Sequence, residues 1–316
     1  MAEDWKVDGF SEVVLCVQDL QVWTNFFQQL GEWNAGPTTD VADEQLAFWG
    51  GQGAGRQCLL QTAESQSSRI RLCQFSGMTQ QRIREDDYCW DTGGIVDINI
   101  RINNTDYIQQ HLADRNWRAF SEPVAWKFGD NEVVEWLSQG PDGVTIAFIE
   151  RVSPPLINRN FKHISHTFNS SQIVNDMPAA LSFYKRLGFE ELMHHAGPLP
   201  GISGKVLGLD AEEAPNTEVE IYIVQPQGQL DGSVELVTID KPGKDFADCA
   251  QPYNLGISAL RFPVSNIGSY ARHLEKNDIA IEKDTIVQFE LPPYGKVASL
   301  AVQTPDGTWL EFFEPL

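Results

Sequence analysis

Hydrophobic and polar residues follow the same order in two distant parts of the chain. Each part opens with a β-rich stretch, at residues 13–17 and 171–174. An aspartate follows, Asp19 or Asp176, whose carboxylate can cap a helix by accepting hydrogen bonds from free backbone N–H groups. Hydrophobic residues then recur at helical spacing up to Gly31 or Gly188, where glycine can end a helix in a left-handed conformation. The pattern predicts a strand followed by a helix in both places.

These two parts align in register, and further repeats join the rest of the chain. The repeated segments are 19–31 with 176–188, 104–112 with 266–274, and 139–150 with 303–314. The last pair carries Pro-Asp-Gly, which favours a turn, and then alternating hydrophobic residues typical of a strand. The chain therefore reads as four modules, each a strand, a helix and about three strands.

The prolines Pro154 and Pro155 break regular structure and mark a boundary between two domains. We expect modules one and two to form residues 1–155, and modules three and four to form residues 156–316. A Gly- and Pro-rich insertion at 196–215 is either a surface loop or a lid, and we favour a surface loop.

The net charge of the chain limits the classes of partner that we expect it to bind. The chain has 316 residues with 44 Asp and Glu against 23 Lys and Arg, a net charge of −21 that repels phosphate backbones and anionic lipid. We predict no nucleic-acid or membrane partner, a small-molecule ligand and a possible homodimer. The acidic start lacks a signal-peptide pattern, which favours a cytoplasmic location. Five cysteines without a C-x-x-C motif argue against a disulfide framework and a zinc-thiolate site.

Two stretches resemble the vicinal oxygen chelate superfamily of glyoxalases, bleomycin-resistance proteins and extradiol dioxygenases. They are DMPAALSFYKRLGFEE at 176–191 and TPDGTWLEFFEP at 304–315. The resemblance implies an α+β fold in which four βαβββ modules pair into two similar domains, each a cupped mixed β-sheet with helices outside. It also implies a functional cup in the C-terminal domain. Because this fold supports many reactions, the resemblance does not fix the chemistry.

The resemblance further implies a site for one divalent metal ion (Fe, Mn, Ni or Zn). Its ligands would lie on the first and last strands of the modules, at positions that we identify as Glu12, Asp97, Asn169, Ala259, Ala147, Glu235 and Glu311. No histidine occupies a first-strand position, which departs from the family pattern. A small slip in register would bring His166, or less easily His163, inward, so the candidate metal ligands are Glu311, His166 and Glu235. The cofactor is either one such ion or none.

Strand alternation gives the remaining candidates, because every second residue shares a face. The predicted inward residues of the C-terminal cup are Asn169, Ser171, Ala259, Arg261, Trp309, Glu311 and Phe313. Arg261 and Glu311 form either a structural ion pair or a clamp for a substrate carboxylate. Trp309 and Phe313 either stack on a ligand or belong to the core.

Histidine and carboxylate side chains supply two more candidates. His194 follows the third helix near the cup rim, where it is either a general base or a solvated side chain. Glu12 and Asp97 could hold a hard cation or share a proton. They could also be polar residues of a degenerate half.

We predict an enzyme of lyase or isomerase type, with an atypical or absent metal site, that acts on a small apolar or aromatic catabolite in the C-terminal cup. Its catalytic residues would be Glu311, His166 and Arg261. Asn169, Ser171, Ala259, Trp309, Phe313 and His194 would contact the substrate. The alternatives are a metal-free protein that sequesters a small molecule, and an extradiol-type ring-cleaving dioxygenase that uses His166 and Glu311.

Overall fold

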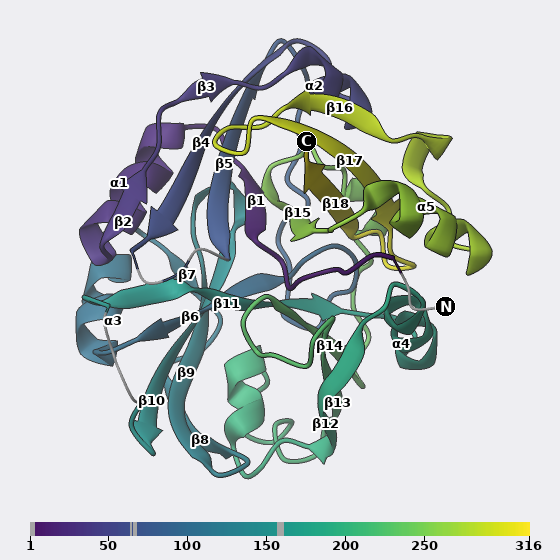
Figure 1. Cartoon of the computed structure of the whole chain (residues 1–316). Coiled ribbons are helices and arrows are strands. Elements are labelled where there is room, and N and C mark those ends of the chain that lie inside the picture. Colours follow the sequence, from purple (N-terminus) through teal and green to yellow (C-terminus); the bar gives the residue numbers. More distant parts are fainter. Residues whose placement is uncertain (1–3, 64, 66–67, 157–160) are drawn as a thin grey trace.

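Two curled β-sheets make up most of the protein (Figure 1). The computed structural model describes residues 4–63, 65, 68–156 and 161–316. The four predicted βαβββ modules are all present, so the α+β prediction is confirmed. None of the described helices has the length and apolar character needed to cross a bilayer.

Each module starts with a strand and a helix and continues with further strands. Module one contains β1 (Glu12–Cys16), α1 (Leu20–Leu30), β2 (Trp33–Ala35), β3 (Thr39–Asp40), α2 (Asp43–Phe48), β4 (Ala54–Thr62) and β5 (Arg69–Ser76). Module two contains β6 (Asp97–Ile102), α3 (Thr105–Ala113), β7 (Arg118–Ala119), β8 (Val124–Phe128), β9 (Asn131–Gln139), the 3-10 turn η1 (Pro141–Gly143) and β10 (Thr145–Ser153).

The second half of the chain repeats this plan. Module three contains β11 (Ile164–Ile173), α4 (Met177–Arg186), β12 (Glu190–Pro198), η2 (Ser203–Leu207), β13 (Glu218–Gln225) and β14 (Ser233–Ile239). After η3 (Ala247–Cys249), module four contains β15 (Gly256–Pro263), α5 (Ile267–Lys276), η4 (Glu282–Asp284), β16 (Val287–Glu290), β17 (Lys296–Gln303) and β18 (Trp309–Pro315).

The main helix of every module begins at a side-chain cap. The carboxylate or amide oxygens of four residues accept hydrogen bonds from backbone N–H groups in the first helical turn, at Asp19, Asn104, Asp176 and Asn266. Gly188 follows the third of these helices with a φ of 91°, as predicted. Gly31 instead has an extended backbone with a φ of −132°, so the predicted left-handed ending of α1 is wrong.

The sheets do not pair consecutive modules, which corrects the expected assignment of modules to domains. Strand β1 pairs with β15, so modules one and four share a sheet, and β6 pairs with β11, so modules two and three share the other. Each sheet therefore takes one module from each half of the chain. We call the concave faces of these sheets the outer-module cup (modules one and four) and the inner-module cup (modules two and three).

One large hydrophobic core lies between the backs of the two sheets. It joins residues from both, such as Val13 and Leu15 of β1 with Ile98 and Ile100 of β6. At one side of this core α1 lies beside the segment that follows α3, where Phe26 stacks on Trp117 with ring centroids 4.7 Å apart. Since neighbouring residues of a strand point to opposite faces, the two cups open away from this shared core.

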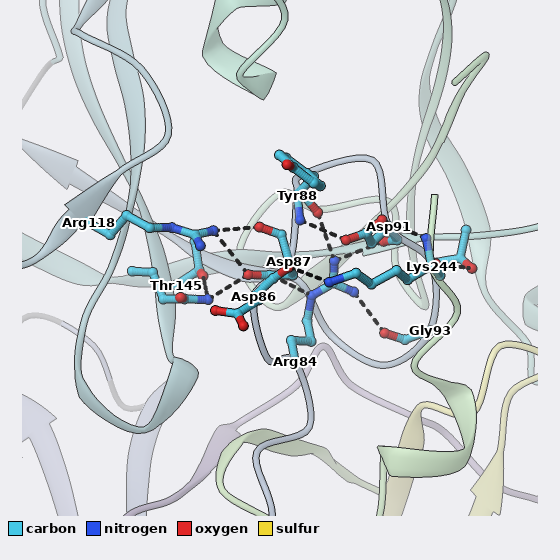
Figure 2. Close-up of polar contacts among 11 residues, drawn as sticks. Arg84, Asp86, Asp87, Tyr88, Asp91, Gly93, Arg118, Thr145 and Lys244 are labelled. Atoms are coloured by element: carbon cyan, nitrogen blue, oxygen red, sulfur yellow. Dashed lines mark hydrogen bonds and ion pairs between the residues drawn. The ribbon is translucent and has the colours of Figure 1, made fainter. Parts of the chain in front are cut away.

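A polar junction holds together the linkers that connect consecutive modules (Figure 2). Arg84 is buried and donates from Nε to Asp87 Oδ2 (2.9 Å), and its terminal nitrogens donate to backbone carbonyls of the same loop. The backbone N–H of Lys244 donates to Asp91 Oδ1 (2.7 Å), which ties the linker after module three to the linker after module one. Because the charged groups of this junction bind protein atoms, we interpret it as structural.

Candidate active site

The outer-module cup is closed by a buried network of charges. The side chains of Glu12, Arg71, Arg261 and Glu311 are at most 1% exposed. Glu12 Oε1 lies 2.6 Å from Arg71 Nη2, and Glu12 Oε2 lies 3.1 Å from Arg261 Nη1. Arg261 Nε also lies 3.1 Å from Glu311 Oε1. Burial raises the pKa of Glu12, but the two arginines outweigh it and lower that pKa to about 2.

Aromatic side chains fill the rest of this cup. Trp49 Nε1 donates to Glu311 Oε2 (3.1 Å), and Ser299 Oγ donates to Glu311 Oε1 (3.1 Å). Trp309 packs against Phe48, and Phe313 packs against Tyr294. The Arg261–Glu311 contact is therefore a structural ion pair, and both oxygens of Glu311 already have protein partners. This corrects the prediction of Glu311 as a catalytic carboxylate and metal ligand.

The inner-module cup carries different residues at the same positions. Both cups pair their central strands alike, so the inward residues can be matched by register. The matched positions, outer cup first, are Glu12 and Asp97, Arg71 and Ala147, Arg261 and Ser171, Glu311 and Glu235, and Gln57 and Glu135. The acids are kept at two positions, while alanine and serine replace the arginines and a third acid replaces a glutamine.

A cavity of about 130 Å³ lies in this cup. Its apolar lining comes from Trp126, Val133, Ile149, Phe168, Met193, Ile221, Ile223 and Leu230. Its polar lining comes from Asn99, Arg101, Asn131, Glu135, Arg151, Asn169 and Glu235. An apolar cavity only slightly larger holds benzene in another protein, so this space suits a small organic molecule. A few polar groups in a mostly apolar cavity are typical of ligand sites.

Two carboxyl groups that line this space, and a third that acts on both through its charge, have raised pKa values. For Glu135, burial and then the charge of Glu235 raise the pKa to about 8, despite a hydrogen bond from Trp126 Nε1 (3.0 Å). For Glu235, burial and then the charge of Asp97 raise the pKa to about 7, despite a hydrogen bond from Asn169 Nδ2 (3.3 Å). Burial also raises the pKa of Asp97 to about 6. Around neutral pH this cup can therefore both give and take a proton.

The insertion after β12 covers the inner-module cup. Leu199, Val206, Leu209 and Ala214 of this segment are buried and pack with residues of the cup, such as Ile221. The favoured prediction of a plain surface loop is wrong, because the segment carries apolar side chains that the cup buries.

The structure divides the predicted site residues between the two cups. Asn169, Ser171 and Glu235 lie in the inner-module cup, whereas Ala259, Arg261, Trp309, Glu311 and Phe313 lie in the outer-module cup. His166 belongs to β11 and Glu311 to β18, in different sheets, so the predicted metal pair is not formed. An irregular register in β11 brings Phe168 and Asn169 to the cavity, while His166 Nε2 lies 3.3 Å from Asp231 Oδ2.

His194 faces away from the cavity, which corrects its predicted role in substrate binding. Its neighbour Met193 lines the cavity, and strand alternation turns His194 to the outer face of β12. There its ring stacks on Tyr222 with centroids 4.0 Å apart, and Nε2 lies 3.2 Å from Glu220 Oε1. These contacts make His194 a surface residue.

Glu135 and Arg101 were missed by the sequence analysis, although the sequence carried a signal for each. Glu135 alternates with Val133 and Leu137 along β9, so a charged residue shares a face with two apolar ones. Arg101 follows Asp97 and Asn99 at alternate positions of β6, on the face already predicted to point inward.

The residues of neither cup fit the metal ion that the resemblance implied. In the outer-module cup, the two acids, Glu12 and Glu311, are already paired with arginines, Arg71 and Arg261. In the inner-module cup, the corresponding residues are alanine and serine, and no imidazole faces the carboxyl groups. Within the described ranges, no three His, Cys, Asp or Glu side chains are arranged as a metal site. The chemistry is therefore derived from the side chains alone.

Comparisons with known proteins agree with the fold. Residues 160–312 match the family model of the Glyoxalase/Bleomycin resistance protein/Dioxygenase superfamily. Glyoxalase I from Zea mays is similar in structure over 99% of this chain and 93% of that chain, with 14% identity and a TM-score of 0.60. A proposed dioxygenase from Bacillus subtilis is similar over 98% of this chain and 86% of that chain, with 10% identity and a TM-score of 0.60. No curated protein matches the sequence significantly.

These solved structures share the fold, and the matched segment supplies the family in sequence. In sequence, residues 160–312 match the Glyoxalase/Bleomycin resistance protein/Dioxygenase superfamily, and nearly the whole chain has the fold of glyoxalase I.

Proposed function

We propose that the protein is an enzyme that transfers protons at a carbon next to a carbonyl group of a small molecule bound in the inner-module cup. The observation that carries this proposal is the placement of Glu135 and Glu235. Both line a cavity of ligand size, and neither forms an ion pair with any residue that the structure describes. The equivalent outer-module positions hold Gln57 and Glu311, both engaged by protein partners.

The two glutamates supply an acid and a base from opposite walls of the cup, β9 and β14. With pKa values of about 8 and about 7, the pair shares roughly one proton at slightly alkaline pH. The ionised glutamate removes the proton from carbon, and the protonated one donates to the carbonyl oxygen as the enol forms. The newly protonated glutamate then returns a proton to carbon while the other glutamate takes back the proton of the enol oxygen, which re-forms the carbonyl, completes an isomerisation and restores the pair. A reaction of this kind is of isomerase or lyase type and does not cleave a ring.

Hydrogen exchange tests this proposal before the natural substrate is known. The protein would be incubated in neutral D₂O with small ketones and 2-oxo acids, beginning with 3-methyl-2-oxobutanoate. Loss of the proton signal next to the carbonyl, followed by NMR, reports proton removal even without net conversion. We expect exchange that falls by roughly 10²- to 10⁴-fold in Glu135→Gln and in Glu235→Gln.

The matched control is Glu132→Gln, on the same strand as Glu135. The Glu132 side chain is 44% exposed and pairs with Lys127, so this variant should exchange like the wild type. Equal exchange in the wild type and the two cavity variants would contradict the proposal. Compounds that bind, as seen from the Trp126 indole signal, without any exchange would instead indicate a sequestering protein.

A further inference from the structure

The inner-module cavity has a basic end as well as an acidic end. Arg101 of β6 and Arg151 of β10 both line it, together with Glu135 and Glu235. The charges of Arg151 and Asp231 act on the Arg101 guanidinium, whereas those of Glu235 and Asp97 act on Glu135, and that of Asp97 acts on Glu235. Ile149 lies between the two ends, because it pairs with Arg101 on one side and with Glu135 on the other.

The guanidinium of Arg101 lacks a carboxylate partner among the described residues. Its Cζ lies 4.2 Å from the centroid of the Phe168 ring, and it belongs to no ion pair within residues 4–63, 65, 68–156 and 161–316. Asp231, the nearest acid to act on it, is engaged by His166 Nε2 at 3.3 Å. Burial and then the charge of Arg151 lower the pKa of Arg101 to about 10, so it stays charged at neutral pH. A half-buried cation that carries this penalty is poised to bind an anion.

We propose that Arg101 binds the carboxylate of the substrate, and that the substrates are small monocarboxylates with a short apolar body. A planar guanidinium fixed against Phe168 offers two parallel N–H donors, which match the two oxygens of a carboxylate. Ile149 and Val133 line the space between the two ends, so the apolar body lies there. The carbon next to a carbonyl then faces the glutamates. Binding of a monocarboxylate at Arg101 stands on its own, whereas its being a substrate rests on the proposed function.

Two probes of nearly the same size but different charge test the inference independently of turnover. Isothermal titration calorimetry would compare 3-methyl-2-oxobutanoate with its neutral amide, 3-methyl-2-oxobutanamide, which has nearly the same size. We expect the wild type to bind the acid roughly tenfold or more tightly than the amide. Arg101→Gln should lose this preference, and Arg101→Lys should keep part of it because lysine retains the charge but not the paired donors.

Arg56→Gln is the matched control, since Arg56 is an exposed arginine on β4 of the other sheet. It should bind both probes like the wild type. Equal binding of acid and amide by the wild type, or an unchanged preference in Arg101→Gln, would overturn the inference. Glu235→Gln separates the two proposals: it should still bind the acid while losing exchange. Normal binding with normal exchange in that variant would refute the acid–base proposal and leave the carboxylate site standing.

Discussion

The two cups hold acids at equivalent positions, yet the acids have opposite properties. In the outer-module cup, Glu12 is buried between Arg71 and Arg261, and its pKa is lowered to about 2. In the inner-module cup, Ala147 and Ser171 stand at the arginine positions, and burial raises the pKa of Asp97, the residue that matches Glu12, to about 6. The comparison shows that the residues beside an acid decide whether it is a fixed charge or a group that can exchange a proton.

The largest effect should come from breaking the outer-module network. Arg261→Met removes one partner of both Glu12 and Glu311, which leaves buried carboxylates without full compensation. We expect the free energy of unfolding at pH 7 to fall by about 3–5 kcal/mol, measured by urea denaturation. The matched change in the inner-module cup, Arg101→Met, should alter it by no more than about 1 kcal/mol. Similar losses in both variants would show that the two cups do not differ in this way.

A smaller effect, of opposite sign, is expected from Glu135→Gln. The folded protein holds a proton on Glu135 up to a pKa of about 8, whereas the unfolded chain loses it near the ordinary value. Stability attributable to this group therefore falls as the pH rises through that window. The variant should match the wild type near pH 4 and exceed it by a few kcal/mol at pH 8, since each pKa unit corresponds to about 1.4 kcal/mol.

Glu12→Gln should change the free energy of unfolding with the opposite dependence on pH. Its pKa is lowered, so Glu12 stabilises the protein above its ordinary pKa, and this contribution is lost as the pH falls towards 2. The variant should be less stable than the wild type at pH 7, and the difference should shrink in acid. If both variants showed the same dependence of unfolding free energy on pH, the assignment of the two environments would be wrong.

The smallest effect should follow Asn169→Ala. Asn169 Nδ2 donates to Glu235, which favours the ionised carboxylate. Removing this bond should raise the pKa of Glu235 further, by roughly one unit or less, and move the acidic limb of the exchange-rate profile to higher pH. Ser138→Ala, a buried position on β9 of the same sheet, serves as the control. A shift to lower pH would contradict the role of Asn169.

Local features of the sequence predicted the modules well. The capping residues Asp19, Asn104, Asp176 and Asn266 mark helices because capping depends only on neighbours in the chain. Strand alternation put Asn169 and Ser171 on one face and Arg261 beside Glu311, and the resemblance added Asp97 and Glu235; the strand register agrees with these placements. These parts of the fold and of the site follow from short-range rules.

The pairing of modules could not be read in the same way. The first strands of the modules have similar patterns of hydrophobic and polar residues. From these patterns alone, β1 could pair with β6 or with β15. The choice depends on long-range packing of both sheets around one core, which places Val13 and Ile98 together. The predicted C-terminal cup therefore merged residues of two separate cups. The possible homodimer and the cytoplasmic location stay predictions.

The most direct test of the account is the titration of the glutamate side chains by carbon-13 NMR. Glu135→Gln, Glu235→Gln and Glu12→Gln would assign the three signals. We predict that the signals of Glu135 and Glu235 change between about pH 6 and pH 9, and that the signal of Glu12 stays constant from neutral pH down to about pH 3. Titration of all three glutamates below pH 5 would contradict the central claim that only the inner-module cup holds exchangeable protons near neutral pH.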